Sequence, residues 1–234
     1  MPQTTRVDEA TGRLLQRIRA GEFADRPLPR EADLAEETGV SRATLRESVK
    51  VLKTQGVLRV EQGRGTFANP VTAWESLDLV ATPGPHASRE ELSVQLIQAR
   101  RMLEIGAIEL FARHCTDAEL DTMRGYLADM TAADAAGDVA GFVRADLAFH
   151  DAILTGCGNV FVPLLIRPIA RHLAQGRHET SSVPAIRTNA LHHHQTILSA
   201  LERRDPRGSI DAMTAHLQQT YDDLRGEVLA HRRP

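Results

Sequence analysis

Four side chains in the C-terminal part of the sequence have the residue types and spacing of a metal site. Asp146 and His150 are four residues apart, so on a helix their side chains meet on one face. His194 and His216 each lie three residues from an apolar residue, which places both on the buried faces of later helices. These four side chains could therefore converge from three helices into one site of three nitrogens and one oxygen.

Imidazole and carboxylate ligands suit zinc, nickel, manganese and iron, and ligand type alone does not choose between them. We take zinc as the first candidate. A single histidine considered alone is more often a surface residue or a hydrogen-bonded one. The metal prediction therefore depends on the whole set, Asp146, His150, His194 and His216.

A second group of side chains could bind DNA. Between residues 42 and 53, a basic stripe is expected on the outward face of a helix and consists of Arg42, Arg46, Lys50 and Lys53. The two arginines lie near the helix N-terminus, the end that usually enters the major groove, where arginine pairs with guanine. The lysines are better placed for phosphates. A basic helix face is more often simply solvated, so the stripe alone is a weak signal.

Charge and histidine are distributed unevenly along the 234 residues. The formal net charge is −3, but residues 1–70 carry a net +2 and residues 71–234 a net −5. Locality matters, because charges more than about 10 Å apart are largely screened. All ten histidines follow residue 85. The two parts of the chain are therefore expected to do different chemistry.

The elements that must position the basic stripe are short. Apolar periodicity and capping signals predict helices at 7–20, 31–37 and 42–55, the last with Ser41 as its N-cap. Two short strands follow over 57–68, and Gly63-Arg64-Gly65 forms the tip of their hairpin, where it could lie against DNA. This layout predicts a winged helix-turn-helix domain over residues 1–70.

The remainder of the chain is expected to be helical. Residues 71–88, with their prolines, are predicted to be a linker. Residues 89–234 then form an antiparallel helical bundle, so the fold class is mainly α. Its helices are predicted at 89–114, 117–134, 138–155, 160–178, 184–203 and 206–230.

Composition favours an intracellular protein. The only cysteines, Cys115 and Cys157, have no metal-binding or redox spacing. The N-terminus has no apolar segment typical of a signal peptide, and no apolar run approaches the roughly 18 residues of a membrane span. We expect a cytoplasmic protein that does not associate with membranes.

Residues 28–68, LPREADLAEETGVSRATLRESVKVLKTQGVLRVEQGRGTFA, closely resemble the winged helix of the GntR family of bacterial transcription regulators. By position, Arg42, Thr44, Arg46 and Gly63 match the DNA contacts of the family. The family usually has Ser-Glu-Arg after Leu-Pro, where this chain has Arg30-Glu31-Ala32. Ala32 cannot make the arginine contact, and whether Arg30 replaces it stays open. The DNA-binding set implied by the stripe, the hairpin and the resemblance is Arg30, Arg42, Thr44, Arg46, Lys50, Gly63 and Arg64.

Residues 90–230 resemble the FCD effector domain of the FadR-type branch of this family. Short motifs around Arg100, Asp146-x-x-Phe149-His150, Gly158-Asn159, His194 and His216 carry the likeness. Metal-binding members of the family hold a divalent ion with one Asp and three His at these positions, and bind the carboxylate of a small organic or sugar acid there. The resemblance implies that Arg100 and Asn159 contact the effector. A salt bridge from Arg100 to Glu104 is an equally good interpretation of that arginine.

These features together predict a homodimeric regulator, not an enzyme, that binds a pseudo-palindromic DNA operator and responds to a small acid. Repression is the commoner mode in the family. Three alternatives stay open at this point: a metal-dependent hydrolase, a sensor whose signal is the metal itself, and a regulator with a purely structural metal. Against the hydrolase, the sequence has no HExxH-like motif that would supply a general base.

Overall fold

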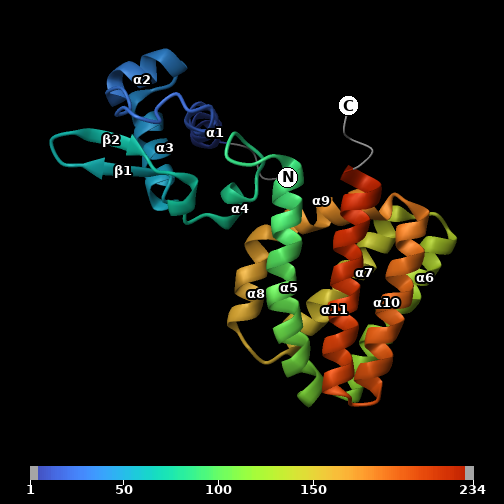
Figure 1. Cartoon of the computed structure of the whole chain (residues 1–234). Helices are drawn as coiled ribbons and strands as arrows, with labels where there is room; N and C mark the ends of the chain where they lie inside the picture. Colours follow the sequence, from blue (N-terminus) through green and yellow to red (C-terminus); the bar gives the residue numbers. More distant parts are fainter. Residues whose placement is uncertain (1–4, 230–234) are drawn as a thin grey trace. The chain divides into compact units, whose positions relative to one another are not determined.

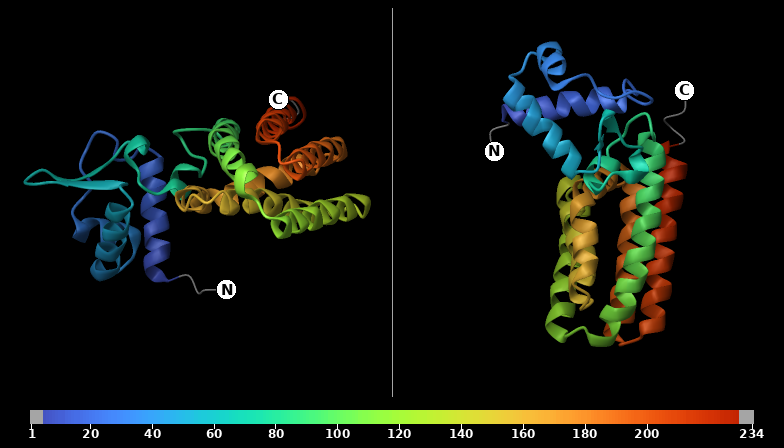
Figure 2. Two further views of the ribbon diagram at one scale, coloured as in Figure 1. Left: turned by 90° about the horizontal axis from the view of Figure 1, so that it is seen from below. Right: turned by 90° about the vertical axis from the view of Figure 1, so that its left-hand side faces the viewer.

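The computed structural model describes residues 5–229. The chain forms two compact units, and the boundary between them in the sequence lies between Arg89 and Glu90. The first unit contains helices α1 to α4 and a two-stranded sheet, and the second is helical (Figures 1 and 2). The prediction of a mainly α protein with an N-terminal winged helix-turn-helix and a C-terminal helical bundle is confirmed.

The first unit has the element order of a winged helix. Its elements are α1 (Arg6–Arg19), α2 (Glu31–Thr38), α3 (Arg42–Thr54), β1 (Leu58–Glu61) and β2 (Gly65–Ala68). The hydroxyl of Ser41 accepts a hydrogen bond from the Thr44 amide and begins α3. The antiparallel pairing runs from Leu58 opposite Ala68 to Glu61 opposite Gly65, so residues 62–64 form the tip of the wing.

One apolar core holds the first unit together. Leu14 of α1, Leu34 of α2 and Leu45 of α3 are almost fully excluded from solvent and belong to the same cluster. Burial of a leucine side chain contributes roughly 1.5–3 kcal/mol relative to exposure. Leu45, Val49 and Leu52 of α3 belong to this cluster, so the opposite face of the helix is mainly polar.

The segment predicted to be a linker, residues 71–88, lies within the first unit. It contains η1 (Val71–Ala73) and α4 (Leu77–Val80), and Trp74 is buried in the core of the unit. The Trp74 indole Nε1 donates a hydrogen bond to the Asn69 carbonyl at 3.1 Å. Gly56 permits this packing, because a Cβ there would lie 2.8 Å from the Ala73 carbonyl oxygen and its φ is +71°.

The second unit is a bundle of helices joined by short connections. They are α5 (Arg89–His114), α6 (Asp117–Ala135), α7 (Val139–Gly156), α8 (Phe161–Ile166), α9 (Ala170–Ser181), α10 (Pro184–Glu202) and α11 (Pro206–Asp223), followed by η3 (Leu224–Leu229). Thr116 and Glu119 form a capping box at the start of α6. Helix α7 packs on α6 and α9, and α10 packs on α6 and α11.

One predicted helix of the bundle is divided. Residues 160–178 form α8, a 3₁₀ turn η2 (Arg167–Ile169) and α9 instead of one continuous helix. Pro168 lies at the break. Proline has no amide hydrogen to donate, and its ring clashes with the carbonyl four residues earlier, so a straight helix cannot pass through it.

None of the helices within residues 5–229 combines the length and the apolar character that crossing a bilayer requires.

Candidate metal centre and nucleic-acid interface

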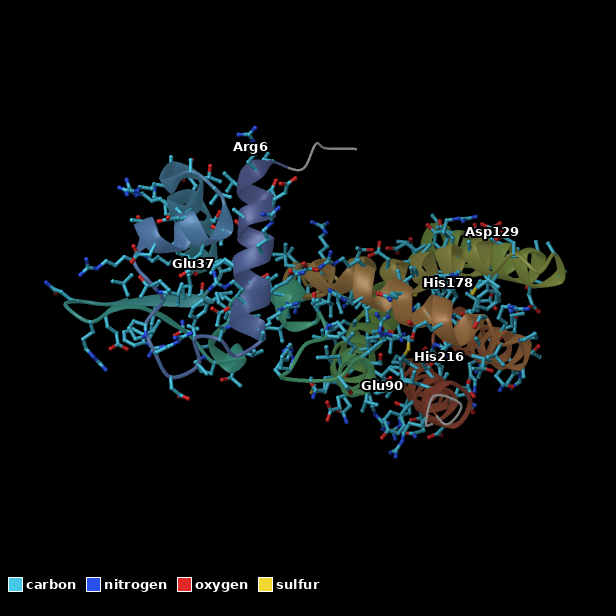
Figure 3. All side chains as sticks on the ribbon, turned by 90° about the horizontal axis from the view of Figure 1, so that it is seen from above. Arg6, Glu37, Glu90, Asp129, His178 and His216 are labelled. Carbon is cyan, nitrogen blue, oxygen red and sulfur yellow. The ribbon has the colours of Figure 1, made fainter. Side chains whose placement is uncertain are left out.

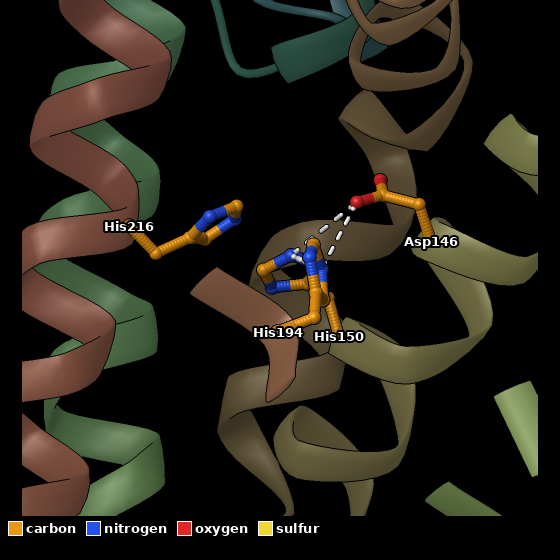
Figure 4. A group of neighbouring side chains, drawn as sticks. All are labelled: Asp146, His150, His194 and His216. Carbon is orange, nitrogen blue, oxygen red and sulfur yellow. Dashed lines mark hydrogen bonds and ion pairs between the residues drawn. The ribbon is translucent and has the colours of Figure 1, made fainter. Parts of the chain in front are cut away.

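The second unit brings together the four side chains that the sequence singled out as metal ligands. Asp146 and His150 come from α7, His194 from α10 and His216 from α11 (Figure 4). All four are buried, and one ligand atom of each lies within 4.8 Å of the others. Residues more than 60 positions apart in the sequence thus meet at one point, which fits the N₃O arrangement expected.

The ligand atoms of this cluster are separated by distances that one central ion could span. Asp146 Oδ1 lies 3.1 Å from His194 Nε2 and 3.8 Å from His150 Nε2. The two Nε2 atoms are 3.2 Å apart. Metal–ligand bonds of about 2.0–2.2 Å to these atoms require ligand separations of this order.

The outer nitrogens of two histidines are already engaged. His194 Nδ1 donates to the Ala190 carbonyl at 2.6 Å. His150 Nδ1 lies 2.7 Å from Glu104 Oε2 of α5. A proton on each Nδ1 leaves the Nε2 lone pair directed into the cluster, as in metal sites whose second-shell partners fix the tautomer. The residues present therefore fit a divalent ion.

The environment favours neutral imidazoles, the form that binds metals. Burial lowers the pKa of His194 well below its ordinary value, and the neighbouring His150 lowers it further. Burial, followed by the proximity of His194 and His150, lowers the pKa of His216 in the same way. His216 Nδ1 is buried and has no hydrogen-bond partner among the described residues. An unpartnered buried nitrogen costs free energy that a ligand at this position would recover.

The histidines of the chain do not all share this environment. Figure 3 labels His216 within the helical unit and His178 on α9, where the latter is exposed. The buried cluster is thus distinct from the general histidine content of the second unit.

Arg100 forms the salt bridge to Glu104 that was one of its two interpretations, and its contact with an effector stays a prediction. Its Nε donates to Glu104 Oε1 at 2.8 Å, and both side chains are buried. Its Nη2 is also buried but has no hydrogen-bond partner within the described part of the chain. Burial raises the pKa of Glu104, but Arg100 and His150 outweigh this and hold it well below the usual range. Arg100 is therefore held by Glu104 with one donor left over.

Arg177 of α9 is a member of the cluster that the sequence analysis missed. It is buried, and its Nη1 is in ion-pair contact with Asp146 Oδ2. Burial lowers its pKa well below the usual value, and repulsion from Arg100 adds to this effect. No periodic partner or motif marks residue 177 in the sequence, so only the packing of α9 on α7 reveals it.

A cavity adjoins the cluster. Its empty space is about 440 Å³ including the open mouth, and its lining includes Arg100, Asp146, Arg177 and His216. The other predicted effector residue, Asn159, is not among the lining residues. It is exposed, and its Oδ1 accepts a hydrogen bond from the Phe161 amide at 3.0 Å, at the beginning of α8. The structure thus brings Arg100 to the cavity and leaves Asn159 outside it.

In the first unit, the predicted DNA-reading residues of α3 face solvent. Arg42, Arg46 and Lys50 are all exposed. Arg46 Nε lies 3.1 Å from Glu31 Oε2, and Lys50 Nζ lies 2.8 Å from Glu47 Oε1. Such exposed ion pairs contribute only about 0–1 kcal/mol, so a phosphate or a base edge can replace the carboxylate.

The remaining predicted DNA contacts flank this helix. Thr44 is half-buried in the first turn of α3, and its hydroxyl lies 2.8 Å from that of Ser41. Arg30 is exposed immediately before α2. At the wing tip, Gly63 adopts a φ of +75°, and the Arg64 guanidinium lies over the Phe67 ring.

An exposed basic helix beside a two-stranded wing, in a chain whose helical unit has a buried polar cluster next to a cavity, defines a DNA-binding regulator with a sensor domain. The family model described as "Bacterial regulatory proteins, gntR family" matches residues 6–68. The model of the FCD domain matches residues 95–219, more than half of the chain. The chain belongs to the GntR family and carries an FCD domain, and this family consists of transcription regulators, not enzymes. The hydrolase alternative is thereby set aside.

Named relatives and solved structures agree with this assignment. The chain is 28% identical over 200 residues to the transcriptional regulator LutR of Bacillus subtilis, covering 82% of this chain and 89% of LutR. It is 27% identical over 219 residues to the transcriptional repressor NanR of Cronobacter sakazakii, covering 89% of this chain and 81% of NanR. The solved structure of Lar, which controls the Listeria monocytogenes agr system, aligns with a TM-score of 0.63 at 19% identity, covering 97% of this chain and 100% of Lar. This last likeness concerns the fold alone.

Proposed function

We propose that this regulator is a cytoplasmic, homodimeric repressor whose FCD domain holds a divalent metal ion and senses a small carboxylic or sugar acid. One observation carries the proposal. Asp146, His150, His194 and His216 are buried with their ligand atoms within 4.8 Å of one another, beside a cavity that also exposes Arg100. NanR, a relative, is named as a repressor, which supports this sign of regulation.

Different residues of the pocket would bind the metal ion and the acid. Asp146 and the three histidines would hold the ion, zinc being the first candidate and nickel, manganese or iron the others. When bound, the ion would act as a Lewis acid that attracts a carboxylate oxygen. The free Nη2 of Arg100 would donate a charge-assisted hydrogen bond to the same acid. Glu104 holds the Arg100 side chain in place for this contact.

The first unit would read the operator through α3 and the wing. Arg42 and Arg46 would contact base edges in the major groove, with Thr44 beside them. Phosphate contacts would come from Arg30, Lys50 and the Gly63-Arg64 tip of the wing. A single winged helix buries too little surface for high specificity, so two copies would bind a pseudo-palindromic operator.

The coupling between the two sites can be tested by fluorescence anisotropy on a DNA fragment selected by the protein from random sequences. We expect the zinc-loaded protein to bind this fragment and to lose at least tenfold in affinity when a matching acid from a panel of small acids is added. Effector coupling is typically 5–150-fold. The His150→Ala variant should bind the DNA but ignore the acid, and the control His178→Ala should behave like wild type.

Three results of this experiment would contradict the proposal. A change in DNA affinity on adding metal alone, with no further effect of any acid, would identify a metal sensor. An acid response that survives both chelation and His150→Ala would reduce the ion to a structural role. A selection that recovers no DNA sequence would contradict DNA binding itself.

A further inference from the structure

Arg177 lies where a second anionic group of a ligand would be bound. It is 8% exposed, and its Nε has no hydrogen-bond partner among the described residues. Arg100, at 2% exposed, has an equally unpartnered Nη2. An unsatisfied buried donor of this kind is unfavourable, and more so when it carries a charge. Both arginines line the cavity beside the histidines.

A second cavity continues from the first. It encloses about 390 Å³ including its mouth, and it shares Arg100, Arg177, Thr180 and Thr220 with the first cavity. Apolar side chains from α5, α9 and η3 form its other wall: Leu96, Ile97, Leu173 and Leu224. The two guanidinium groups thus line both spaces, the first bounded by polar and apolar groups and the second mainly by apolar groups. A short carbon chain in this region could present acidic groups to both arginines.

The charges of the buried cluster balance only without a metal ion. Two cations, Arg100 and Arg177, face two anions, Glu104 and Asp146. A divalent ion held by Asp146 and the neutral histidines leaves an excess of two positive charges. It also competes with Arg177 for the Asp146 carboxylate. Uncompensated buried charge is strongly unfavourable, so an anionic ligand would supply the balance.

Building on the metal-dependent sensor proposed above, we infer that Arg177 is the second anion-binding residue of the pocket and that the effector is a short dicarboxylic acid. One carboxylate takes the position beside the metal ligands and Arg100. The other carboxylate pairs with Arg177. This arginine loses its ion pair with Asp146 when the Asp146 carboxylate binds the metal. A monocarboxylate neutralises only one of the two excess charges, so the pocket discriminates by the second acidic group.

Matched ligands test this inference on the wild-type, zinc-loaded full chain. Three pairs differ only by replacement of one carboxylate with a methyl group: malate and 2-hydroxybutyrate, succinate and butyrate, and glutarate and pentanoate. Isothermal titration calorimetry should show at least one dicarboxylate binding about tenfold or more tightly than its partner, because a carboxylate accepts charge-assisted hydrogen bonds that a methyl group cannot accept.

The Arg177→Gln variant should remove this preference by weakening the dicarboxylate and leaving the monocarboxylate within about twofold. Arg177→Lys, which keeps the charge, should retain part of it. Arg207→Gln, an exposed arginine of α11, is the matched control and should change nothing. Circular dichroism and zinc content verify that each variant is folded and loaded, and the wild-type ligand pairs decide the question if a variant does not fold.

The outcomes separate this inference from the function on which it rests. Equal affinity for both members of every pair that binds, unchanged by Arg177→Gln, would overturn the dicarboxylate inference and leave a metal-dependent acid sensor intact. Absence of binding by any mono- or dicarboxylate, with or without zinc, would overturn both.

Discussion

Each unit of the chain contains an arginine–glutamate ion pair, which is exposed in the first unit and buried in the second. In the first unit, Arg46 Nε lies 3.1 Å from Glu31 Oε2, and these side chains are 62% and 43% exposed. In the second, Arg100 Nε lies 2.8 Å from Glu104 Oε1, and the exposures are 3% and 2%. The distances are alike, but water screens only the first pair.

This difference shows how each unit makes its charges available. The exposed arginine can exchange a carboxylate for DNA at little cost, because the pair is worth about 0–1 kcal/mol. The buried arginine cannot leave its glutamate, because separation would leave a charge in a medium of low dielectric. It offers its spare donor to a ligand instead. One unit is suited to a polyanion outside the fold, the other to a small anion within it.

The largest expected effect is on stability. Glu104→Gln should lower the free energy of unfolding by about 3–5 kcal/mol, because Arg100 loses its buried counter-charge. Glu31→Gln, its exposed counterpart, should cost less than about 1 kcal/mol. Urea denaturation of the metal-free protein measures both. Equal losses for the two variants would mean that burial does not distinguish the pairs.

The next effect concerns operator binding. Arg46→Ala should weaken binding to the selected DNA by about 1–3 kcal/mol and relax the preference for one base, because a bidentate contact is lost. Its stability should stay within about 0.5 kcal/mol of wild type, as for other exposed positions. Arg6→Ala, an exposed arginine of α1 labelled in Figure 3, is the control. If Arg46→Ala binds the DNA as tightly as the control, α3 is not part of the DNA interface.

A pH titration sharpens the contrast in the second unit. Burial lowers the pKa values of His194 and His216, so below about pH 6.5 the unfolded chain binds more protons than the folded chain. Stability of the metal-free protein should fall with decreasing pH in this range, by about 1.4 kcal/mol per pH unit for each histidine. The loss should end once the pH reaches the lowered pKa.

Urea midpoints recorded between about pH 5 and 7.5 measure this slope. His216→Gln should make the slope shallower, whereas His114→Gln, at an exposed position, should leave it unchanged. A wild-type stability that is flat with pH would show that the two imidazoles are protonated in the folded protein.

The smallest effect is expected at Lys50 of α3, whose side chain is 62% exposed. Lys50→Ala should weaken binding to all DNA sequences alike and reduce the slope of log affinity against log salt by about 0.9. Anisotropy titrations at several salt concentrations measure that slope. A loss confined to one base position would reassign Lys50 from phosphate contact to base reading.

Much of the fold was predictable, because local signals mark it. Ser41 and the Thr116–Glu119 capping box begin helices where the sequence predicts them. The break near Pro168 was missed, although proline is itself the signal for it. The burial of Trp74 was also missed, because Trp74 lies in a short apolar segment between prolines that the sequence analysis predicts to be a linker.

The candidate site was predictable only in part, for a physical reason. Asp146 and His150 share a helix face, so their spacing in the sequence predicts that their side chains lie together. The contact between His150 and Glu104 depends on how α5 packs on α7, and the contact between Arg177 and Asp146 depends on α9. Contacts of this kind between distant helices leave no pattern in either helix alone. Asn159 illustrates the reverse, because a motif match predicted an effector contact for a residue that is exposed and whose Oδ1 accepts from the Phe161 amide, outside the lining of the cavity.

The central claim is that the buried Asp146, His150, His194 and His216 cluster holds one divalent ion, and metal stoichiometry tests it directly. We expect elemental analysis after dialysis to find one zinc or other divalent transition-metal ion per chain in the wild type and in His178→Ala. We expect none in His150→Ala or His194→Ala. A wild-type protein that retains no metal at micromolar supply, or a His194→Ala variant that retains a full equivalent, would contradict the account.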